Sequence, residues 1–328
     1  MAAWYRRLLW SATALALFVV VLGAAVRLND AGLGCPDWPG CYGVLIPTDI
    51  DNQTAIEEFP ERPVEVGKAW YEMVHRYVAT TLGFLIVLIT WCAWRNHHAP
   101  GQPFKTPLVL LGVVIFQGLL GMWTVTLKLK PIIVMAHLLG GLTSFSLILW
   151  LMFSSRRPMT DKPNIQIRRM RPAIITALFI LALQIALGGW TSANYAALAC
   201  PDVPMCTGQW WPDADFKEGF ILWREVGVDY EGGLLDHRSR IAIHLTHRIG
   251  AVVTLFVLIA LAIRSLKIPR LRTGGQVLMV LVVGQFMLGV LNVALYLPLA
   301  NAVAHNAGAV LLLATLLGLL NKTTTRTY

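Results

Sequence analysis

The sequence predicts an all-α integral membrane protein whose eight transmembrane helices form two pseudo-symmetric four-helix bundles. Three observations lead to this fold class. Hydrophobic residues make up 56% of the 328 residues and charged residues only 14%, whereas about a quarter of a soluble domain is charged. The apolar residues gather in long runs, and the second half of the chain repeats motifs of the first. This composition excludes a disordered chain, a nucleic-acid binder with a soluble core and a small disulfide scaffold.

Eight apolar runs are long enough to cross a bilayer, which requires roughly 20 residues for about 30 Å of hydrocarbon. They lie near 8–26, 69–93, 107–127, 132–153, 173–192, 241–263, 275–296 and 300–320. The lipid bilayer is therefore the first partner that the composition implies. Because eight is an even number, both termini are expected on the same side.

The net charge of +9 is distributed unevenly over the connecting segments. Sixteen of the 18 acidic residues lie in two long loops, 28–68 and 193–238. Sixteen of the 27 basic residues lie in the termini and in the loops after the second, fourth and sixth runs. Because Lys and Arg in short loops are retained in the cytoplasm, we predict cytoplasmic termini and long loops outside. The basic stretches are short and juxtamembrane, so we expect no nucleic-acid partner.

A duplication organises the chain. The motif Cys-Pro-Asp-x-Pro-x-Cys stands at 35–41 and again at 200–206, an offset of 165. Further pairs recur at offsets of 168 and 172, namely Gln117 and Gln285, Gly121 and Gly289, His137 and His305, His75-Arg76 and His247-Arg248. Four spans per half give both halves one orientation about an axis along the membrane normal.

The duplication predicts three parts. An N-terminal bundle covers 1–155, a basic cytoplasmic linker covers 156–169, and a C-terminal bundle covers 170–328. Ligand and cofactor sites in helix bundles are built from side chains on facing helices. The search for function therefore turns to polar residues inside the predicted spans.

Four histidines lie at one depth, two in each predicted bundle: His75, His137, His247 and His305. A single intramembrane histidine is ordinarily a polar residue that is hydrogen-bonded to a neighbouring helix. Two on different helices, repeated in both halves, instead suit a planar haem that is held axially on both sides. A zinc or copper site would need three or four clustered ligands, and the cysteines lie elsewhere.

The other histidines divide by position. We expect His97 and His98, in a cytoplasmic loop, and His237, in an outer loop, to be solvated. His244 lies in the sixth span, one turn before His247. It therefore occupies the position that Glu72 has before His75.

Glu72 is the only acidic residue within the predicted spans, and it precedes His75 by one helical turn. A buried carboxylate beside a cofactor can accept a proton or orient water. The alternative is an ion pair with Arg76 or Lys68 near the membrane surface. Because the second half has His244 in this place, the asymmetry suggests chemistry in the first half and a resident cofactor in the second.

The arginines, glycines and glutamines near the histidines each have two possible roles. Arg76 and Arg248 directly follow their histidines, and they either meet haem propionates or extend outward to the membrane surface. Three glycines follow a histidine by three residues, and they either let a flat ring approach the backbone or serve helix packing; they are Gly140, Gly250 and Gly308. Gln117 and Gln285 either line the pockets or bridge helices.

The cysteines separate by compartment. Two pairs, Cys35 with Cys41 and Cys200 with Cys206, lie in the predicted outer loops, where an oxidising environment lets disulfides persist. Five intervening residues make a short loop that a disulfide can close, so we favour two disulfides over metal binding. Cys92 lies at the inner end of the second span and is expected to serve packing.

In these motifs the chain resembles the haem A synthase family, in its bacterial cysteine-containing form. The resemblance is carried by VRLNDAGLGCPDWPGCYG after the first span, EMVHR, MAHLLGG, THR and AHNAG. It covers nearly the whole chain. It implies an enzyme, an oxidoreductase that oxidises the C8 methyl of haem O to the formyl group of haem A for terminal oxidases.

The resemblance also implies roles for the singled-out residues. His75 and His137 would hold haem O as substrate or haem A as product, and Glu72 would be the catalytic carboxylate. His247 and His305 would ligate a resident haem b, with Arg76 and Arg248 among the cofactor-binding residues. The outer cysteines would form the disulfides Cys35–Cys41 and Cys200–Cys206.

Further expectations concern location and partners. The resemblance implies a multi-pass protein of the bacterial cytoplasmic (inner) membrane with its long loops on the periplasmic side. It implies haem O synthase, the assembly of a terminal oxidase and a membrane electron acceptor as partners, and a homo-oligomer is compatible with the sequence.

Two other functions compete with this one. A di-haem b electron-transfer subunit linked to quinol would use the same four histidines without converting its haem. A transporter of haem or small molecules would need helices broken near the midplane. The apolar runs contain no paired midplane prolines, which counts against transport.

Overall fold

The computed structural model describes residues 3–99, 101–156 and 163–325. Within these ranges the chain is helical and has no strand. Eight long helices are each long and apolar enough to cross a membrane, which confirms the predicted spans. They are α1 (Ala3–Leu28), α3 (Val66–Arg95), α4 (Lys105–Thr126), α5 (Pro131–Arg156), α7 (Arg171–Ala193), α9 (His237–Leu266), α10 (Arg272–Ala294) and α11 (Leu299–Thr323).

Short helices occupy the connections. They are η1 (Pro47–Asp49), α2 (Asn52–Glu58), α6 (Ile165–Arg169) and α8 (Phe216–Gly219). His237, which was predicted in an outer loop, is instead the first residue of α9, because the Asp236 side chain caps the helix there by accepting from the Ser239 N–H. It is nevertheless exposed, as are His97 and His98 in the turn after α3.

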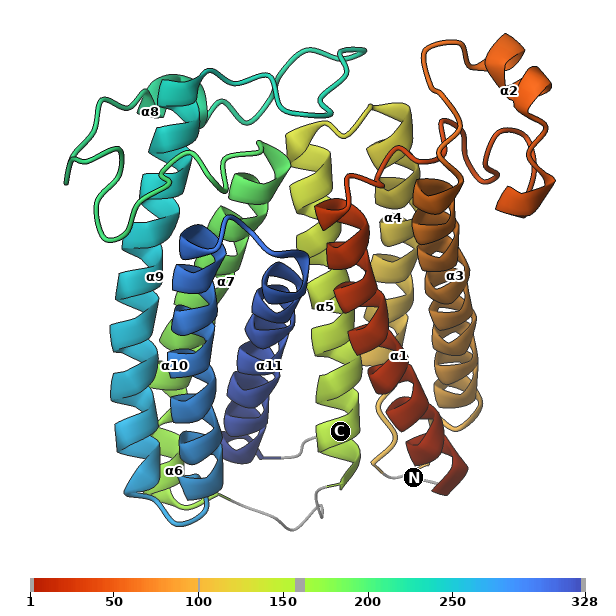
Figure 1. Cartoon of the computed structure of the whole chain (residues 1–328). Helices are drawn as coiled ribbons and strands as arrows, with labels where there is room; N and C mark the ends of the chain where they lie inside the picture. The colour runs from red at the N-terminus through yellow and green to blue at the C-terminus, as the bar shows by residue number, and fades with distance from the viewer. Residues whose placement is uncertain (1–2, 100, 157–162, 326–328) are drawn as a thin grey trace.

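The eight long helices pack as two groups of four. Helices α1, α3, α4 and α5 contact one another, as do α7, α9, α10 and α11, and the groups meet through α1, α5, α7 and α11. Figure 1 shows the helices side by side, with α2 and α8 at one end of the bundle. Helix α1 begins and α11 ends at the opposite end (Figure 1). Which membrane side each end faces stays a prediction, as do the domain boundaries; residues 157–162 of the proposed linker lie outside the described residues.

The backbone repeats at the same offsets as the sequence motifs. Lys128 and Leu129, after α4, adopt positive φ, and so do Tyr296 and Leu297 after α10, 168 residues later. Tyr42 and Thr207, each directly after the second cysteine of a pair, do the same at an offset of 165. The duplicated residues therefore carry the same local turns in both halves.

A continuous apolar core fills the bundle at the end away from α2 and α8. Its fully buried members come from both groups of helices and include Leu9, Ile86, Leu151, Leu258 and Leu316. Lipid tails are as apolar as these side chains, so close packing rather than a hydrophobic difference holds them together. The histidines lie nearer the other end of the helices, above this core.

The outer cysteines form disulfides, as predicted. Cys35 is bonded to Cys41 and Cys200 to Cys206, with Cα–Cα distances of 4.6 and 4.5 Å. Cys92 is free and buried among the core residues, which confirms its packing role.

The aspartate of each cysteine motif fastens its loop. Asp37 accepts hydrogen bonds from the Tyr42 and Gly43 N–H groups, at 2.6 and 3.0 Å. Asp202 accepts from Thr207 and Gly208 at 2.7 and 2.6 Å. The carboxylate thus bonds two N–H groups just beyond the disulfide, where the backbone turns through positive φ.

We predict that Asp202→Ala loosens the second cysteine loop. The N–H groups of Gly208 and Thr207 hold the pKa of Asp202 below its ordinary value of 3.8. Their stabilisation is therefore present above pH 3.8 and is lost as the pH falls through the lowered pKa of the folded state. Amide hydrogen exchange at Thr207 and Gly208, measured at pH 7, should accelerate in the variant.

The matched control is Asp213→Ala, because Asp213 pairs with Arg238 at the exposed surface. It should leave exchange at Thr207 and Gly208 unchanged. Equal exchange in wild type and Asp202→Ala would show that the disulfide alone orders this loop.

Candidate functional site

Each predicted ligand histidine lies against a glycine of the neighbouring helix. His75 on α3 meets Gly23 of α1, and His247 on α9 meets Gly188 of α7. His137 and His305 meet Gly121 and Gly289 in the same way. A Cβ at these glycines would lie 3.0 to 3.4 Å from the imidazole Cε1, a tight contact that the ring could accommodate only by shifting.

Three of the four histidines are also contacted by a glutamine side chain. The Gln184 amide nitrogen lies 3.0 Å from the His247 carbonyl oxygen and 3.1 Å from its Nδ1. With its nitrogen as donor, the Gln117 amide makes the same two contacts to His137, at 3.0 and 3.1 Å. The Gln285 amide donates to the His305 carbonyl oxygen at 2.9 Å. Gln117 and Gln285 therefore bridge helices onto the histidines.

The glycines that follow three of the histidines lie in close contact with a glutamine of the adjacent helix. A Cβ on Gly140 would collide with the Gln117 amide, and a Cβ on Gly250 or Gly308 would collide with Gln184 or Gln285. These glycines therefore seat the glutamines of the adjacent helix, because the amide needs the space that a side chain would fill. Of the two roles considered from the sequence, these contacts favour helix packing.

The histidines of each half act as pairs. They come from two helices of the same group, His75 from α3 and His137 from α5, and His247 from α9 and His305 from α11. Among the described residues, no three His, Cys, Asp or Glu side chains gather as a metal ion would require. Two imidazoles from different helices match the axial ligand set of a haem iron.

Three further observations fit a flat macrocycle rather than a bare ion. The four histidines are only half-buried, although all lie within membrane-spanning helices. The Nδ1 atoms of His75 and His305 are buried without a hydrogen-bond partner among the described residues. Their rings rest on glycines, which hold them in place from the helix side.

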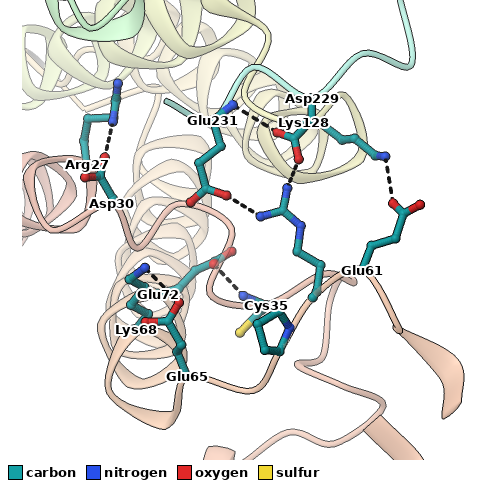
Figure 2. Close-up of polar contacts among 12 residues, drawn as sticks. Arg27, Asp30, Cys35, Glu61, Glu65, Lys68, Glu72, Lys128, Asp229 and Glu231 are labelled. Atoms are coloured by element: carbon teal, nitrogen blue, oxygen red, sulfur yellow. Dashed lines mark hydrogen bonds and ion pairs between the residues drawn. The ribbon is translucent and has the colours of Figure 1, made fainter. Parts of the chain in front are cut away.

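Glu72 is buried directly beneath the first cysteine loop. Its Oε2 accepts a hydrogen bond from the Cys35 N–H at 3.0 Å (Figure 2), and its Oε1 is 2.5 Å from Arg76 Nη2. The pairing with Arg76 is thus present, and Lys68 pairs instead with Glu65. Cys35 brings the disulfide loop into contact with the one carboxylate in the spans.

Arg76 binds the cysteine loop as well as Glu72. Its guanidinium donates to the carbonyl oxygens of Asp37, Pro39 and Gly40, at 3.1, 3.1 and 2.5 Å. These bonds give an arginine in a membrane-spanning helix the partners that it requires. A contact of Arg76 with a haem propionate stays a prediction.

The second half has the same arrangement without a carboxylate. The Cys200 N–H lies 3.4 Å from His244 Nδ1, in the place of the bond between Cys35 and Glu72. Arg248 donates to the carbonyl oxygens of Cys200 and Met205 at 2.7 and 2.8 Å. His244, unlike His75 or His247, is fully enclosed at 4% exposure, and it supports the loop.

Contacts between the two long outer loops were not predicted from the sequence. Arg62 of the first loop pairs with Asp229 and Glu231 of the second. The second loop also contacts the turn after α4, where the Lys128 carbonyl accepts from the Tyr230 N–H at 3.0 Å. Figure 2 shows Asp229 and Glu231 close together and Lys128 extending to Glu61. The loops of the two halves are therefore tied together above the helices.

Sequence reasoning also missed Gln184, although a signal was available. Gln117 and Gln285 each precede a glycine by four residues, and Gln184 precedes Gly188 by the same spacing. The fourth copy of this pattern is Val19 before Gly23. Comparing all four helices, rather than the two halves, would have found both the third glutamine and its replacement.

The fold and the site define a class of protein: an eight-helix membrane protein with a histidine pair within the spans of each half. The chain belongs to the family described as cytochrome oxidase assembly protein, whose sequence pattern matches residues 6–317. It is 44% identical to the heme A synthase of Shewanella oneidensis, over 92% of this chain and 91% of that protein.

More distant relatives match over the same extent. The heme A synthase of Shouchella clausii is 28% identical over 92% of this chain and 90% of its own. That of Caulobacter vibrioides is 28% identical over 93% and 92%. The family resemblance predicted from the sequence motifs is confirmed.

We predict that Arg76→Leu lowers stability much more than Lys68→Leu. Removing Arg76 leaves a buried Glu72 carboxylate without its counter-charge and three carbonyl oxygens without a donor. Loss of one partner of such a buried pair typically costs about 3–5 kcal/mol. Thermal unfolding of the detergent-solubilised protein measures the difference.

Lys68→Leu is the matched control, because the Lys68–Glu65 pair lies in the first turn of the same helix at an exposed site. Such pairs contribute about 0–1 kcal/mol. Equal melting temperatures for the two variants would mean that Arg76 is not needed to hold Glu72.

Proposed function

We propose that this protein is a haem A synthase that oxidises the C8 methyl group of haem O to a formyl group within the membrane. The observation that carries the proposal is the difference between the halves at equivalent places. Cys35 contacts the carboxylate Glu72 in the first half, whereas Cys200 contacts the imidazole His244 in the second. Only the first histidine pair has a carboxylate one helical turn away.

In this proposal His75 and His137 hold the substrate haem, and His247 and His305 hold a resident haem b. Haem supplies a redox-active iron in both places and, in the first, the methyl group that is oxidised. The glycines at the ring edges and the glutamines on the adjacent helices orient the imidazoles. Orientation of ligands by surrounding groups sets the strength of a metal site.

Glu72 is the proposed catalytic residue. Conversion of a methyl to a formyl group, counted with one water, releases four protons and four electrons. The carboxylate of Glu72 is held at one oxygen by the Cys35 N–H and at the other by Arg76. Held in this way, with lone pairs to spare, it can accept protons from the reacting group or from an oriented water. The electrons pass to a membrane acceptor.

The cellular setting is part of the proposal. The loops rich in acidic residues face the periplasm and the basic termini face the cytoplasm of a bacterial inner membrane, as the positive-inside rule requires. Haem O synthase supplies the substrate, and assembly of a terminal oxidase consumes the product. The relatives that bear the name heme A synthase support this setting.

We predict that Glu72→Gln stops formyl formation and leaves both haems bound. The amide oxygen can still accept from the Cys35 N–H, but it is a far weaker proton acceptor, so conversion should fall by about 100-fold or more. Mass analysis of haem extracted from cells that also make haem O measures haem A directly. Glu65→Gln, at the exposed start of the same helix, is the control and should convert normally.

Loss of both haems in Glu72→Gln would assign Glu72 a structural role instead. A wild-type protein that yields haem b and no formyl haem under these conditions would favour the quinol-linked electron-transfer alternative.

We predict that single histidine variants separate the two haems. His137→Ala should lose haem O and haem A while keeping haem b, because only the first pair is broken. His247→Ala should lose haem b while keeping haem O. Pigment analysis of each purified variant measures the two contents, and His237→Ala, an exposed residue, is the control. Loss of the same haem from both variants would contradict one haem per half.

A further inference from the structure

We propose that His75 is the exchangeable axial ligand of the substrate haem, and that Val19 and Val78 make it so. This inference rests on the proposed function, since it takes His75 and His137 as the ligands of that haem. It goes further by stating which of the two imidazoles leaves the iron, and which neighbouring residues decide it.

The first observation is a pattern that occurs four times and changes once. Helices α4, α7 and α10 each carry a glutamine four residues before the glycine that supports a histidine ring. On α1 the corresponding residue before Gly23 is Val19. His75 is therefore the one ligand candidate among the described residues that no glutamine amide contacts.

The second observation is that the glycine that makes room for the glutamine is also absent beside His75. The residue three positions after the histidine is glycine on α5, α9 and α11, and each glycine makes room for the amide. On α3 this residue is Val78. Where the other three helix pairs have glutamine with glycine, this pair has valine with valine, so it lacks the amide and carries a side chain at the position of the glycine.

The physical consequence concerns the Nδ1 atom of the imidazole. A side chain that hydrogen-bonds a ligating histidine holds it in place and strengthens the ligand. The amide nitrogens of Gln117 and Gln184 lie 3.1 Å from Nδ1 of His137 and His247, and each donates to the backbone carbonyl oxygen of the same histidine at 3.0 Å. The Nδ1 of His75 is buried without a partner among the described residues.

His305 is a useful comparison within the same molecule. Its Nδ1 also lacks a partner among the described residues, as does the Gln285 amide oxygen. Gln285 nevertheless donates to the His305 backbone carbonyl oxygen at 2.9 Å. Val19 has no group that could hydrogen-bond His75, so His75 is the most weakly supported of the four.

The position of His75 on α3 gives its weaker support a functional consequence. Glu72 and His75 lie one turn apart on α3, so a coordination position that His75 gives up lies on the side of the catalytic carboxylate. The firmly held His137 keeps the haem in place from the other helix. Exchange at His75 therefore opens the substrate iron toward Glu72, while the haem b of the second half stays closed.

Carbon monoxide binding to the reduced protein tests the proposal. A haem with two firmly bound imidazoles has no free position, so we expect wild-type protein that carries haem O and haem b to bind one carbon monoxide per two haems. The double variant Val19→Gln/Val78→Gly gives His75 the glutamine, and the glycine that makes room for it, found beside the other three histidines. It should slow carbon monoxide binding on the order of tenfold, and Val78→Gly alone is the control that should not slow it.

The reverse change provides the matched experiment in the second half. Gln184→Val/Gly250→Val gives His247 the surroundings of His75, and it should raise the stoichiometry to two carbon monoxide molecules per two haems. This variant keeps the proposal testable if the first double variant does not fold. Unchanged rate in the first variant, or unchanged stoichiometry in the second, would overturn the proposal.

These outcomes separate the inference from the proposed function. If His137→Ala keeps all of its haem O, the haem assignment itself fails. The other case is a protein that still converts haem O to haem A with the histidines assigned as proposed, while the Val19 and Gln184 double variants leave carbon monoxide binding unchanged. In that case only the proposed exchange at His75 is wrong.

Discussion

A polar side chain inside a lipid bilayer must find its partners within the protein, because neither water nor lipid tails can supply them. This constraint explains most of the polar residues in the eight helices. Each predicted ligand histidine rests closely against a glycine of a neighbouring helix. In three of the four helix pairs a glutamine then bonds the histidine backbone. The helix spacing around the site is therefore set by imidazole and amide groups, whereas apolar packing sets it lower in the bundle.

The same constraint links the site to the outer loops. Arg76 and Arg248 sit in membrane-spanning helices and satisfy their guanidinium groups with carbonyl oxygens of the cysteine loops. Each disulfide and its aspartate keep those carbonyls in place. Glu72 is held between the Cys35 N–H and Arg76, so the loop outside the membrane fixes the position of a carboxylate inside it. The cysteine motif thus acts on the site through backbone atoms.

Duplication followed by divergence accounts for the division of labour that we propose. The two halves share their disulfide loops, their arginines and their histidine–glycine contacts. They differ where Glu72 replaces His244, and where Val19 and Val78 replace a glutamine and a glycine. These changes all fall around His75. One half has kept the complete set of supporting amides, and the other has gained a carboxylate and lost one amide.

The sequence by itself determined the eight spans, because hydrocarbon thickness fixes their length. It favoured disulfides within the two cysteine pairs over metal binding, because five intervening residues make a short loop that a disulfide can close. It also located the four histidines and the glutamate. The duplication is evident from the sequence because its motifs recur at fixed offsets. The family resemblance followed from those motifs.

Only the tertiary structure decided which groups touch. Gly140, Gly250 and Gly308 seat glutamines rather than a flat ring, since the contact depends on how two helices are rotated against each other. The ties from Arg62 to Asp229 and Glu231 join loops about 170 residues apart, and no periodicity encodes such a meeting. Hydropathy and spacing specify elements one at a time, whereas a site depends on the register between them, which packing alone determines.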